Sequence, residues 1–586
     1  MQNLKSIIYI VFFLLFYIHT TAQQYYLKGQ VNDEAGNGLQ NVSILQASSG
    51  YVFYTGSSGS FGILTNRLKD SLTFSLEGYE KKKIAVAATD FSNITLKRAI
   101  VSNSSRRYKL ASFTKDLKRE IQQQWFAGDE TYASIIENGF VPADKYPSTG
   151  LTLNVDRASY SNIRRFLNTK TIVPPDAVRI EEMLNYFNLD YREPKNKKTF
   201  EISAALTNCP WNINSQLLFA TIRSKKVSLD SLPATHLVFL IDISGSMDMP
   251  NRLPLLKSGF RGLVYNLREK DSVSIVVYGG VVGIMLNTTS GAEKQKIFNV
   301  IDSLQPGGST PGESGIKLAY NVARKHFIKN GNNRVILATD GDFNVGLRSE
   351  QELEEMIIAQ RESGIYLTCL GVGMGNYKDS KIQTLAQKGN GNFAYIDNYP
   401  EAEKVLLKEF VQTLYTVADD VYLNVQFDPA YVKEYRLIGF DNKVGAIKDS
   451  SAIIEGGEIG SGYSMMVCFE IMPTNKLSEP GIIQPVEFKL QYKLPKENNE
   501  NELIEKPSIE FHSLQQQDKF YQFASAVISF GSLLRDSKYI KETSWNEIIE
   551  LATLSADVNQ PTQQEFIALL QQAKIIYSKK VKKKLF

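Results

Sequence analysis

The chain has 586 residues, of which 43% are apolar and 22% are charged, a composition that excludes wholesale disorder and a coiled-coil rod. This length exceeds what one hydrophobic core supports and predicts several domains. The formal net charge of +4, from 66 basic and 62 acidic residues, disfavours a nucleic-acid binder that works through a basic field. Three cysteines and four histidines form no paired zinc motif, which disfavours zinc chemistry.

Residues 1–22 have the pattern of a signal peptide. Lys5 precedes an apolar run from Ile7 to Ile18 that is too short to span a bilayer, and small residues lead up to Ala22. We expect cleavage after Ala22 and export to the periplasm, the outer envelope or the cell surface, with an uncleaved N-terminal anchor as the alternative. No later apolar stretch is long enough for a membrane helix, so no transmembrane span is expected in the mature chain.

Residues 23–97 predict a small β-sandwich, because short alternating runs are separated by turn signals such as DEAGNG and SSGS. The informative positions are Gly29, Val31, Asp33, Gly36, Gly38, Leu39, Asn41, Val42, Gly59, Ser60, Phe61 and residues 72–79. In these positions the segment resembles the carboxypeptidase regulatory-like domain common in exported Bacteroidetes proteins. The resemblance implies an accessory fold without catalytic residues, either a spacer or a glycan-binding surface. Residues 98–130 are polar without clear periodicity and predict a linker.

Residues 233–416 alternate strand and helix and predict a doubly wound α/β (Rossmann-like) domain. Strand-like runs such as HLVFLIDIS, SVSIVVYG, RVILATDG and IYLTCLGVG indicate a largely parallel sheet that helices cover on both faces. In such sheets ligands bind beyond the carboxyl ends of the strands. Helices are expected at residues 252–268, 292–304, 315–327 and 350–363.

Three polar clusters follow the strands of this domain. Asp242, Ser244 and Ser246 come after HLVFLI, Thr310 lies in the Gly-rich turn GGST, and Asp340 directly follows RVILAT. Alternate residues of an extended loop point the same way, so the first three side chains can converge. Two carboxylates and three hydroxyls form an all-oxygen ligand set, which suits Mg²⁺, or alternatively Mn²⁺ or Ca²⁺, rather than zinc.

The order and spacing of these clusters resemble the metal-ion-dependent adhesion site of von Willebrand factor A domains. The family pattern falls on five positions: Asp242, Ser244, Ser246, Thr310 and Asp340. The resemblance implies that the hydroxyls ligate the metal directly, that the aspartates act largely through water, and that a partner protein supplies the last ligand as a carboxylate. Because the turn has one residue more than usual, Ser309 is the alternative to Thr310 as ligand.

Both flanks of this domain carry further recognisable stretches. LTLNVDRASY, PPDAVRIEE and CPWN lie within residues 131–232, and FDPA, EYRLIGF and GEIG lie within residues 417–578. They resemble the N-terminal segment and the C-terminal domain of unknown function of one bacterial von Willebrand A lineage. Strand-like alternation on both sides, with helical spacing at 520–534 and 544–554, predicts a β-rich α+β flanking domain, built as one sandwich from both flanks. The lysine-rich end, residues 579–586, is expected to be a solvated tail, with contact to anionic lipid or lipopolysaccharide as the alternative.

These features predict a multi-domain, exported and non-enzymatic protein-interaction module of the cell envelope. It would bind the Asp or Glu carboxylate of an unidentified partner protein through Mg²⁺. Two alternatives stay open: a structural or glycan-binding envelope protein acting through residues 23–97, and a metal-dependent hydrolase. A hydrolase needs a general base near metal-bound water, and no histidine lies in the three clusters.

Overall fold

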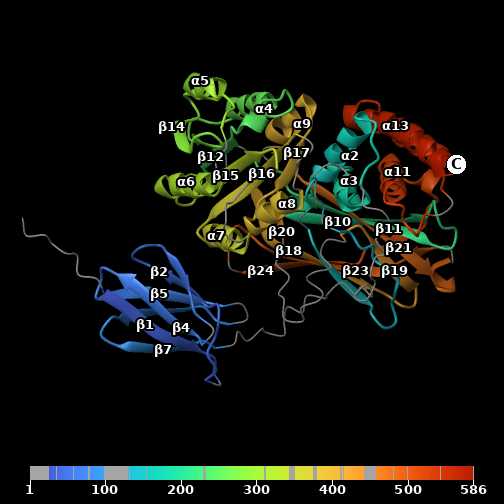
Figure 1. Cartoon of the computed structure of the whole chain (residues 1–586). Helices are drawn as coiled ribbons and strands as arrows, with labels where there is room; N and C mark the ends of the chain where they lie inside the picture. The colour runs from blue at the N-terminus through green and yellow to red at the C-terminus, as the bar shows by residue number, and fades with distance from the viewer. Residues whose placement is uncertain are drawn as a thin grey trace, which may run out of the picture. The chain divides into compact units, whose positions relative to one another are not determined.

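The structure, a computed structural model, describes residues 25–97, 130–440 and 457–584, apart from short gaps inside these ranges. The gaps are residues 35, 57, 77–78, 131, 133, 154, 229–231, 309–311, 342–349, 374–378, 410–411, 413–414, 479–480, 496, 498 and 541–542. The chain divides into two compact units, residues 1–106 and residues 107–586 (Figure 1). The predicted signal peptide and the predicted linker, except Glu130, lie outside the described residues.

The N-terminal unit is a β-sandwich, as predicted, with sheets of strand order β4-β1-β7 and β3-β2-β5-β6. Burial alternates residue by residue along β4, because successive side chains point to opposite faces. Leu27 and Ile63 of one sheet share a core with Ile44 and Phe74 of the other. The strands are β1 (Tyr25–Asn32), β2 (Ser43–Gln46), β3 (Val52–Tyr54), β4 (Ser60–Thr65), β5 (Lys69–Ser75), β6 (Lys82–Ala87) and β7 (Phe91–Thr95).

The second unit contains the predicted doubly wound domain, here called the A domain, over residues 235–408. Its sheet has the strand order β14-β13-β12-β15-β16-β17, and every neighbouring pair is parallel except the antiparallel pair β13–β14. Strands β12 and β15 are buried along their whole length, which explains their continuous apolar sequence. The strands are β12 (Thr235–Asp242), β13 (Ser272–Tyr278), β14 (Gly283–Ser290), β15 (Asn332–Thr339), β16 (Ile365–Val372) and β17 (Phe393–Ile396).

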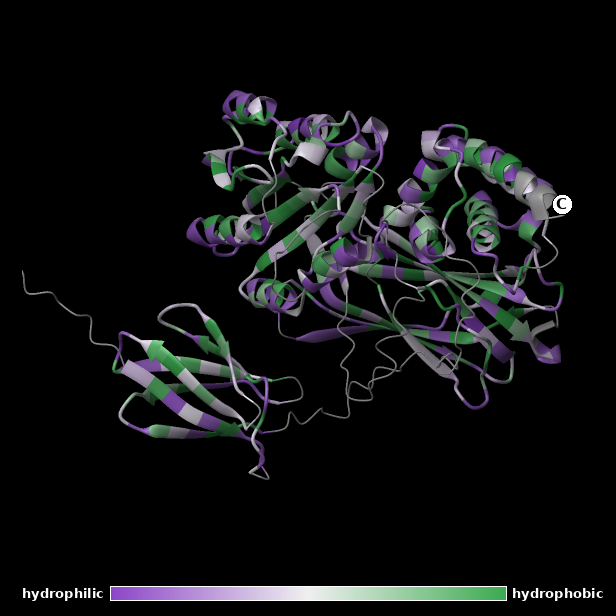
Figure 2. Cartoon of the chain, viewed as in Figure 1, coloured by the Kyte–Doolittle hydropathy of each residue, from purple (hydrophilic) through white to green (hydrophobic). Residues whose placement is uncertain are grey.

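Helices cover both faces of this sheet, so alternate residues of one strand enter different cores. Phe239 of β12 packs in the core with Phe260 of α4, whereas Leu240 packs in the opposite core with Ile316 of α6. Figure 2 shows hydrophobic residues along these strands and hydrophilic residues on the outer sides of the helices. The helices are α4 (Leu253–Tyr265), α5 (Lys294–Ser303), α6 (Gly312–Lys325), α7 (Glu350–Glu362), α8 (Asp379–Lys388) and α9 (Tyr399–Glu403), followed by the π-helix η7 (Lys404–Lys408).

A second β-sandwich is assembled from both flanks of the A domain, as predicted. Its sheets have the orders β10-β11-β21-β19-β8 and β20-β18-β23-β24, and β9 pairs with β18. Phe219, before the A domain, lies opposite Cys468, after it, and Leu151 lies opposite Leu423. The strands are β8 (Val141–Pro142), β9 (Ser148–Thr152), β10 (Phe200–Asn208), β11 (Gln216–Ser224), β18 (Thr416–Phe427), β19 (Val432–Ile438), β20 (Gly457–Gly460), β21 (Ser464–Pro473), β23 (Val486–Lys493) and β24 (Glu500–Glu505), with a small added pair β22 (Ile482–Ile483) and β25 (Ile509–Glu510).

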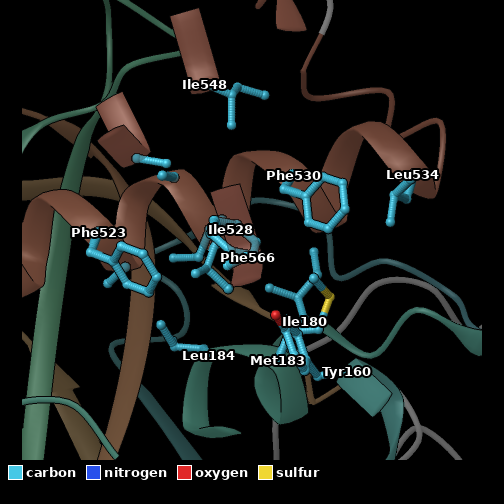
Figure 3. Packing of buried hydrophobic residues seen from close by; sticks show 14 of the residues in the cluster. Tyr160, Ile180, Met183, Leu184, Phe523, Ile528, Phe530, Leu534, Ile548 and Phe566 are labelled. Carbon is cyan, nitrogen blue, oxygen red and sulfur yellow. The ribbon is translucent and has the colours of Figure 1, made fainter. Parts of the chain in front are cut away.

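A helical layer packs on the outer face of one of these sheets. Phe566 of α13 lies against Phe523 and Phe530 of α11, with ring centroids 5.3 Å away in both pairs, and Met183 of α3 closes the same cluster (Figure 3). The helices are α2 (Ala158–Asn168), α3 (Ile180–Tyr186), α11 (Lys519–Leu534), α12 (Trp545–Ser555) and α13 (Pro561–Lys584). Helix α13 extends to Lys584 and therefore includes residues 579–584 of the predicted tail.

A buried ion cluster ties the A domain to both flanks. Arg164 of α2 contacts Asp397, which follows β17, and lies 2.6 Å from Glu401 of α9 and 2.8 Å from Glu565 of α13. Only 2% of the Arg164 side chain is exposed, so these carboxylates replace its water.

Elsewhere, no helix in the described part of the chain has both the length and the apolar character of a membrane span.

Candidate metal centre

The first and third polar clusters meet at the carboxyl edge of the A-domain sheet. Asp242 ends β12 and Asp340 follows β15, and these two strands are parallel neighbours. Both carboxylates are buried, with 2% of Asp242 and 3% of Asp340 exposed. Adjacent parallel strands end at the same edge of a sheet, so the fold brings together two acidic groups separated by almost one hundred residues.

The loop after β12 places two hydroxyls beside the buried carboxylates. The Ser244 N–H donates to Asp242 Oδ1 at 2.8 Å, and the Ser244 and Ser246 hydroxyl oxygens lie 3.0 Å apart. Ser244 is partly exposed and Ser246 is exposed, while the fully buried Met247 anchors the short 3₁₀ turn η6 (Gly245–Met247). The oxygen donors therefore face an open side of the site.

The second cluster is hydrogen-bonded to the first. The Gly245 N–H donates to the Gly308 carbonyl at 3.1 Å, and the Gly307 N–H donates to the Ile243 carbonyl at 2.7 Å. Thr310 and its alternative Ser309 lie outside the described residues, just before α6. Their assignment as ligands stays a prediction.

Electrostatics at this edge favour a cation. Burial raises the pKa of Asp242 to about 6, and the nearby Asp340 carboxylate adds to the rise, against hydrogen bonds from Ser244. Thr339 also donates its hydroxyl to Asp242 Oδ2 at 3.4 Å. Two buried carboxylates with hydroxyls on an open side are a donor set that Mg²⁺, Mn²⁺ or Ca²⁺ accepts. The residues present therefore fit the predicted metal.

Sequence reasoning did not identify two residues of this site. Arg252 donates from Nη1 to Asp340 Oδ2 and to the Ser246 carbonyl, both at 2.6 Å. Gly279 follows β13 and lies so close that a Cβ on it would be 2.3 Å from the Ser244 nitrogen. The Gly-Gly pair after a strand was a readable signal for the second residue. No sequence signal marked Arg252, because its partner Asp340 is 88 positions away.

Among the described residues, His236 and the three cysteines offer no metal ligand at this edge. His236 is fully buried at the opposite end of β12, where its Nε2 lies 3.1 Å from the Ser274 hydroxyl. The three cysteines are free and buried, and Cys369 lies within β16, the strand predicted from the run IYLTCLGVG. Within the described ranges, no three His, Cys, Asp or Glu side chains are grouped in a metal-binding arrangement. A metal here would depend on hydroxyls as well as on the two carboxylates.

Three protein-family models match the chain, and together they cover residues 127–576 except residues 220–235. The model described as von Willebrand factor type A domain matches residues 236–411, which include all three polar clusters. A model described as von Willebrand factor matches residues 127–219, and a model described as uncharacterized protein YfbK, C-terminal, matches residues 412–576. The resemblance of residues 23–97 to a carboxypeptidase regulatory-like domain stays a prediction.

Among solved structures, the von Willebrand factor type A protein from Catenulispora acidiphila is 12% identical, with a TM-score of 0.40, over 65% of this chain and 90% of that chain. A mussel byssus protein, proximal thread matrix protein 1, with a zinc-occupied MIDAS motif is 22% identical, with a TM-score of 0.25, over 30% of this chain and 45% of that chain.

Among curated proteins, the 67 kDa magnesium-chelatase subunit of Chlorobaculum parvum is 25% identical over 190 residues, 29% of this chain and 30% of that protein. The uncharacterized protein YfbK of Escherichia coli strain K12 is 37% identical over 514 residues, which are 83% of this chain and 88% of that protein. The chain therefore belongs to the YfbK family, in which a von Willebrand factor type A domain precedes a YfbK-type C-terminal domain.

Proposed function

We propose that this protein is an exported, non-enzymatic interaction module that binds a carboxylate of a partner protein through a divalent cation. Asp242, Ser244, Ser246 and Asp340 would hold the cation, together with Thr310 or Ser309. Mg²⁺ is the expected ion, because all donors are oxygens. The partner's Asp or Glu would fill the remaining position on the open side.

One observation carries this proposal: two buried carboxylates at the ends of adjacent strands share the carboxyl edge of the sheet with the partly exposed Ser244 and the exposed Ser246. The hydroxyl ligands carry no charge, so a bound cation would keep much of its attraction for an external anion. The position also suits a surface site, because Ser244 is partly exposed and Ser246 is exposed.

Isothermal titration of Mg²⁺ into the EDTA-treated protein tests the metal site directly. We expect one-to-one binding that the double variant Asp242→Ala/Ser244→Ala loses. The matched control is Asp302→Ala/Ser303→Ala, which removes the same residue types from the exposed end of α5 and should bind like wild type. Absence of binding in the wild type, or equal binding by the site variant, would refute the proposal.

Peptide selection tests the carboxylate. A displayed random peptide library is captured on the protein in Mg²⁺ and eluted with EDTA, and an Asp or Glu shared by the eluted peptides is expected. Changing that residue to Asn or Gln in a synthetic peptide should abolish its binding, because a neutral amide is a weaker ligand for a hard cation. Retained binding by the amide peptide would argue against carboxylate recognition.

A metal-dependent hydrolase is less well supported. Hydrolysis would need a general base within reach of metal-bound water, and His236 lies at the other end of β12.

The N-terminal unit offers a second, separate candidate function. Tyr26, Leu64 and Phe91 are 52%, 61% and 56% exposed, and strand pairing places them on one face of the sheet β4-β1-β7.

Such a face could stack against sugar rings and would support the glycan-binding alternative. Binding to a glycan array that EDTA does not change, and that Tyr26→Ala/Phe91→Ala removes, would support it. Wild-type glycan binding by that double variant would exclude this face as the binding surface.

A further inference from the structure

Arg252 bridges two of the three polar clusters. It precedes α4 and is 8% exposed. Its Nη1 lies 2.6 Å from the Ser246 carbonyl of the first cluster and 2.6 Å from Asp340 Oδ2 of the third. A guanidinium therefore sits within the ligand set that the family pattern assigns to a metal.

The surrounding structure holds this guanidinium in position. Gly373, after β16, has a φ of +81°, and a Cβ on it would lie 2.5 Å from Arg252 Nε. The Tyr395 hydroxyl of β17 donates to the Gly373 carbonyl and fixes that backbone against Arg252. Tyr395 is 1% exposed. Arg252 is thus a built-in part of the site and not a surface side chain that has folded over it.

The charges at the site have a direct consequence for its ligand. Asp242 and Asp340 contribute two negative charges and Arg252 one positive charge, which leaves these three groups together with one negative charge. A divalent cation would turn this into one positive charge, and an external carboxylate would neutralise it. Without Arg252 the cation and the two aspartates would already balance, and the site would have less need of an anion.

We infer that Arg252 makes the metal-loaded site select an anionic partner group, while it weakens the binding of the metal itself. This inference rests on the proposed function. The new element is Arg252, whose positive charge favours an anionic partner group. The same charge lowers the affinity for the metal, so the affinities for metal and for carboxylate both depend on this residue. Because Arg252 also holds the Ser246 carbonyl, it acts as a positioning residue and not as a metal ligand.

The test compares neutral and charged variants of Arg252 in the full-length chain. Arg252→Gln keeps an N–H donor and removes the charge, and it should bind Mg²⁺ about tenfold more tightly in isothermal titration, because a nearby positive charge is gone. In the Mn²⁺-loaded protein, acetate proton relaxation measures carboxylate access to the metal, and Arg252→Gln should lose most of this effect. Arg252→Lys keeps the charge and should resemble wild type in both measurements.

The control is Arg261→Gln on α4, where the exposed arginine contacts Asp302 away from the site. Thermal unfolding in EDTA establishes that each variant is folded. If Arg252→Gln does not fold, Arg252→Met is used in its place. Unchanged or weaker Mg²⁺ binding by the neutral variant, with unchanged acetate relaxation, would overturn this inference. If the wild-type protein does not bind Mg²⁺, the proposed function itself is overturned.

Discussion

The close approach of Gly279 to the first cluster allows a sharp test of the site's geometry. Gly279 has a φ of +106°, a conformation that side chains with a Cβ rarely adopt. A Cβ there would lie 2.3 Å from the Ser244 nitrogen and 2.8 Å from Asp242 Oδ1. Gly279→Ala must therefore displace the backbone of the loop that carries the proposed ligands.

Gly279→Ala is expected to lower the free energy of unfolding for two reasons. The positive φ costs an alanine about 1–2 kcal/mol relative to glycine, and the overlap with the Ser244 backbone adds about 1–3 kcal/mol. Displacement of Ser244 also breaks its 2.8 Å hydrogen bond to Asp242. We expect the Kd for Mg²⁺ to rise by at least about tenfold, since ligand atoms must be held to a fraction of an ångström.

Urea unfolding and Mg²⁺ titration measure these two effects. All three tryptophans, Trp125, Trp211 and Trp545, belong to residues 107–586, so their fluorescence reports the unit that contains the A domain. Gly283→Ala at the start of β14 is the control, because a Cβ at Gly283 would have no neighbour within 4 Å. Equal stability and equal Mg²⁺ affinity of the two alanine variants would refute this reasoning.

Two further predictions concern stability. Burial, with a smaller effect of His326, lowers the pKa of His236 to about 4 from its ordinary 6.5, so its contribution is complete above pH 6.5 and is lost as the pH falls toward 4. Near pH 5 the free energy of unfolding is lower by about 2 kcal/mol than above pH 6.5. In urea unfolding, His236→Gln should remove this pH dependence, whereas His512→Gln should leave it unchanged. Arg164→Met should cost about 3–5 kcal/mol by leaving buried carboxylates unpaired, whereas the exposed Arg192→Met should cost at most about 0.5 kcal/mol. Equal unfolding midpoints for the two arginine variants would contradict the last prediction.

The A-domain strands and most of its helices could be predicted because their signals are local. The sequence of β15 is apolar along its whole length, as burial on both faces requires, and α6 shows helical periodicity. Helix α8 was not predicted, because its buried Ile382, Leu385 and Ala386 stand at helical spacing over little more than one turn, which is too short for a clear periodic signal. The hairpin β13–β14 has a register irregularity, which local patterns do not reveal.

The flanking sandwich shows where prediction from sequence is harder. Strand content on both sides of the A domain predicted a shared sandwich, but not which strands are neighbours. The partners β11 and β21 lie almost 250 residues apart in sequence, and their pairing follows from packing of the whole unit. The same is true of the ion pair between Arg164 and Asp397, which are 233 positions apart. An arginine pair in an amphipathic helix is as typical of a solvated surface as of a buried ion cluster.

In the candidate metal centre, too, some features could be predicted from the sequence and others could not. Its acidic and hydroxyl groups could be predicted, because each follows a recognisable strand and the carboxyl ends of parallel strands meet at one edge. The net charge of the site could not be predicted, because Arg252 stands between Asn251 and Leu253 at the start of a helix, and only the fold directs its guanidinium to Asp340. A ligand set predicted from sequence therefore names the atoms that can hold a cation. The charge left over for a partner depends on buried ions that distant segments contribute.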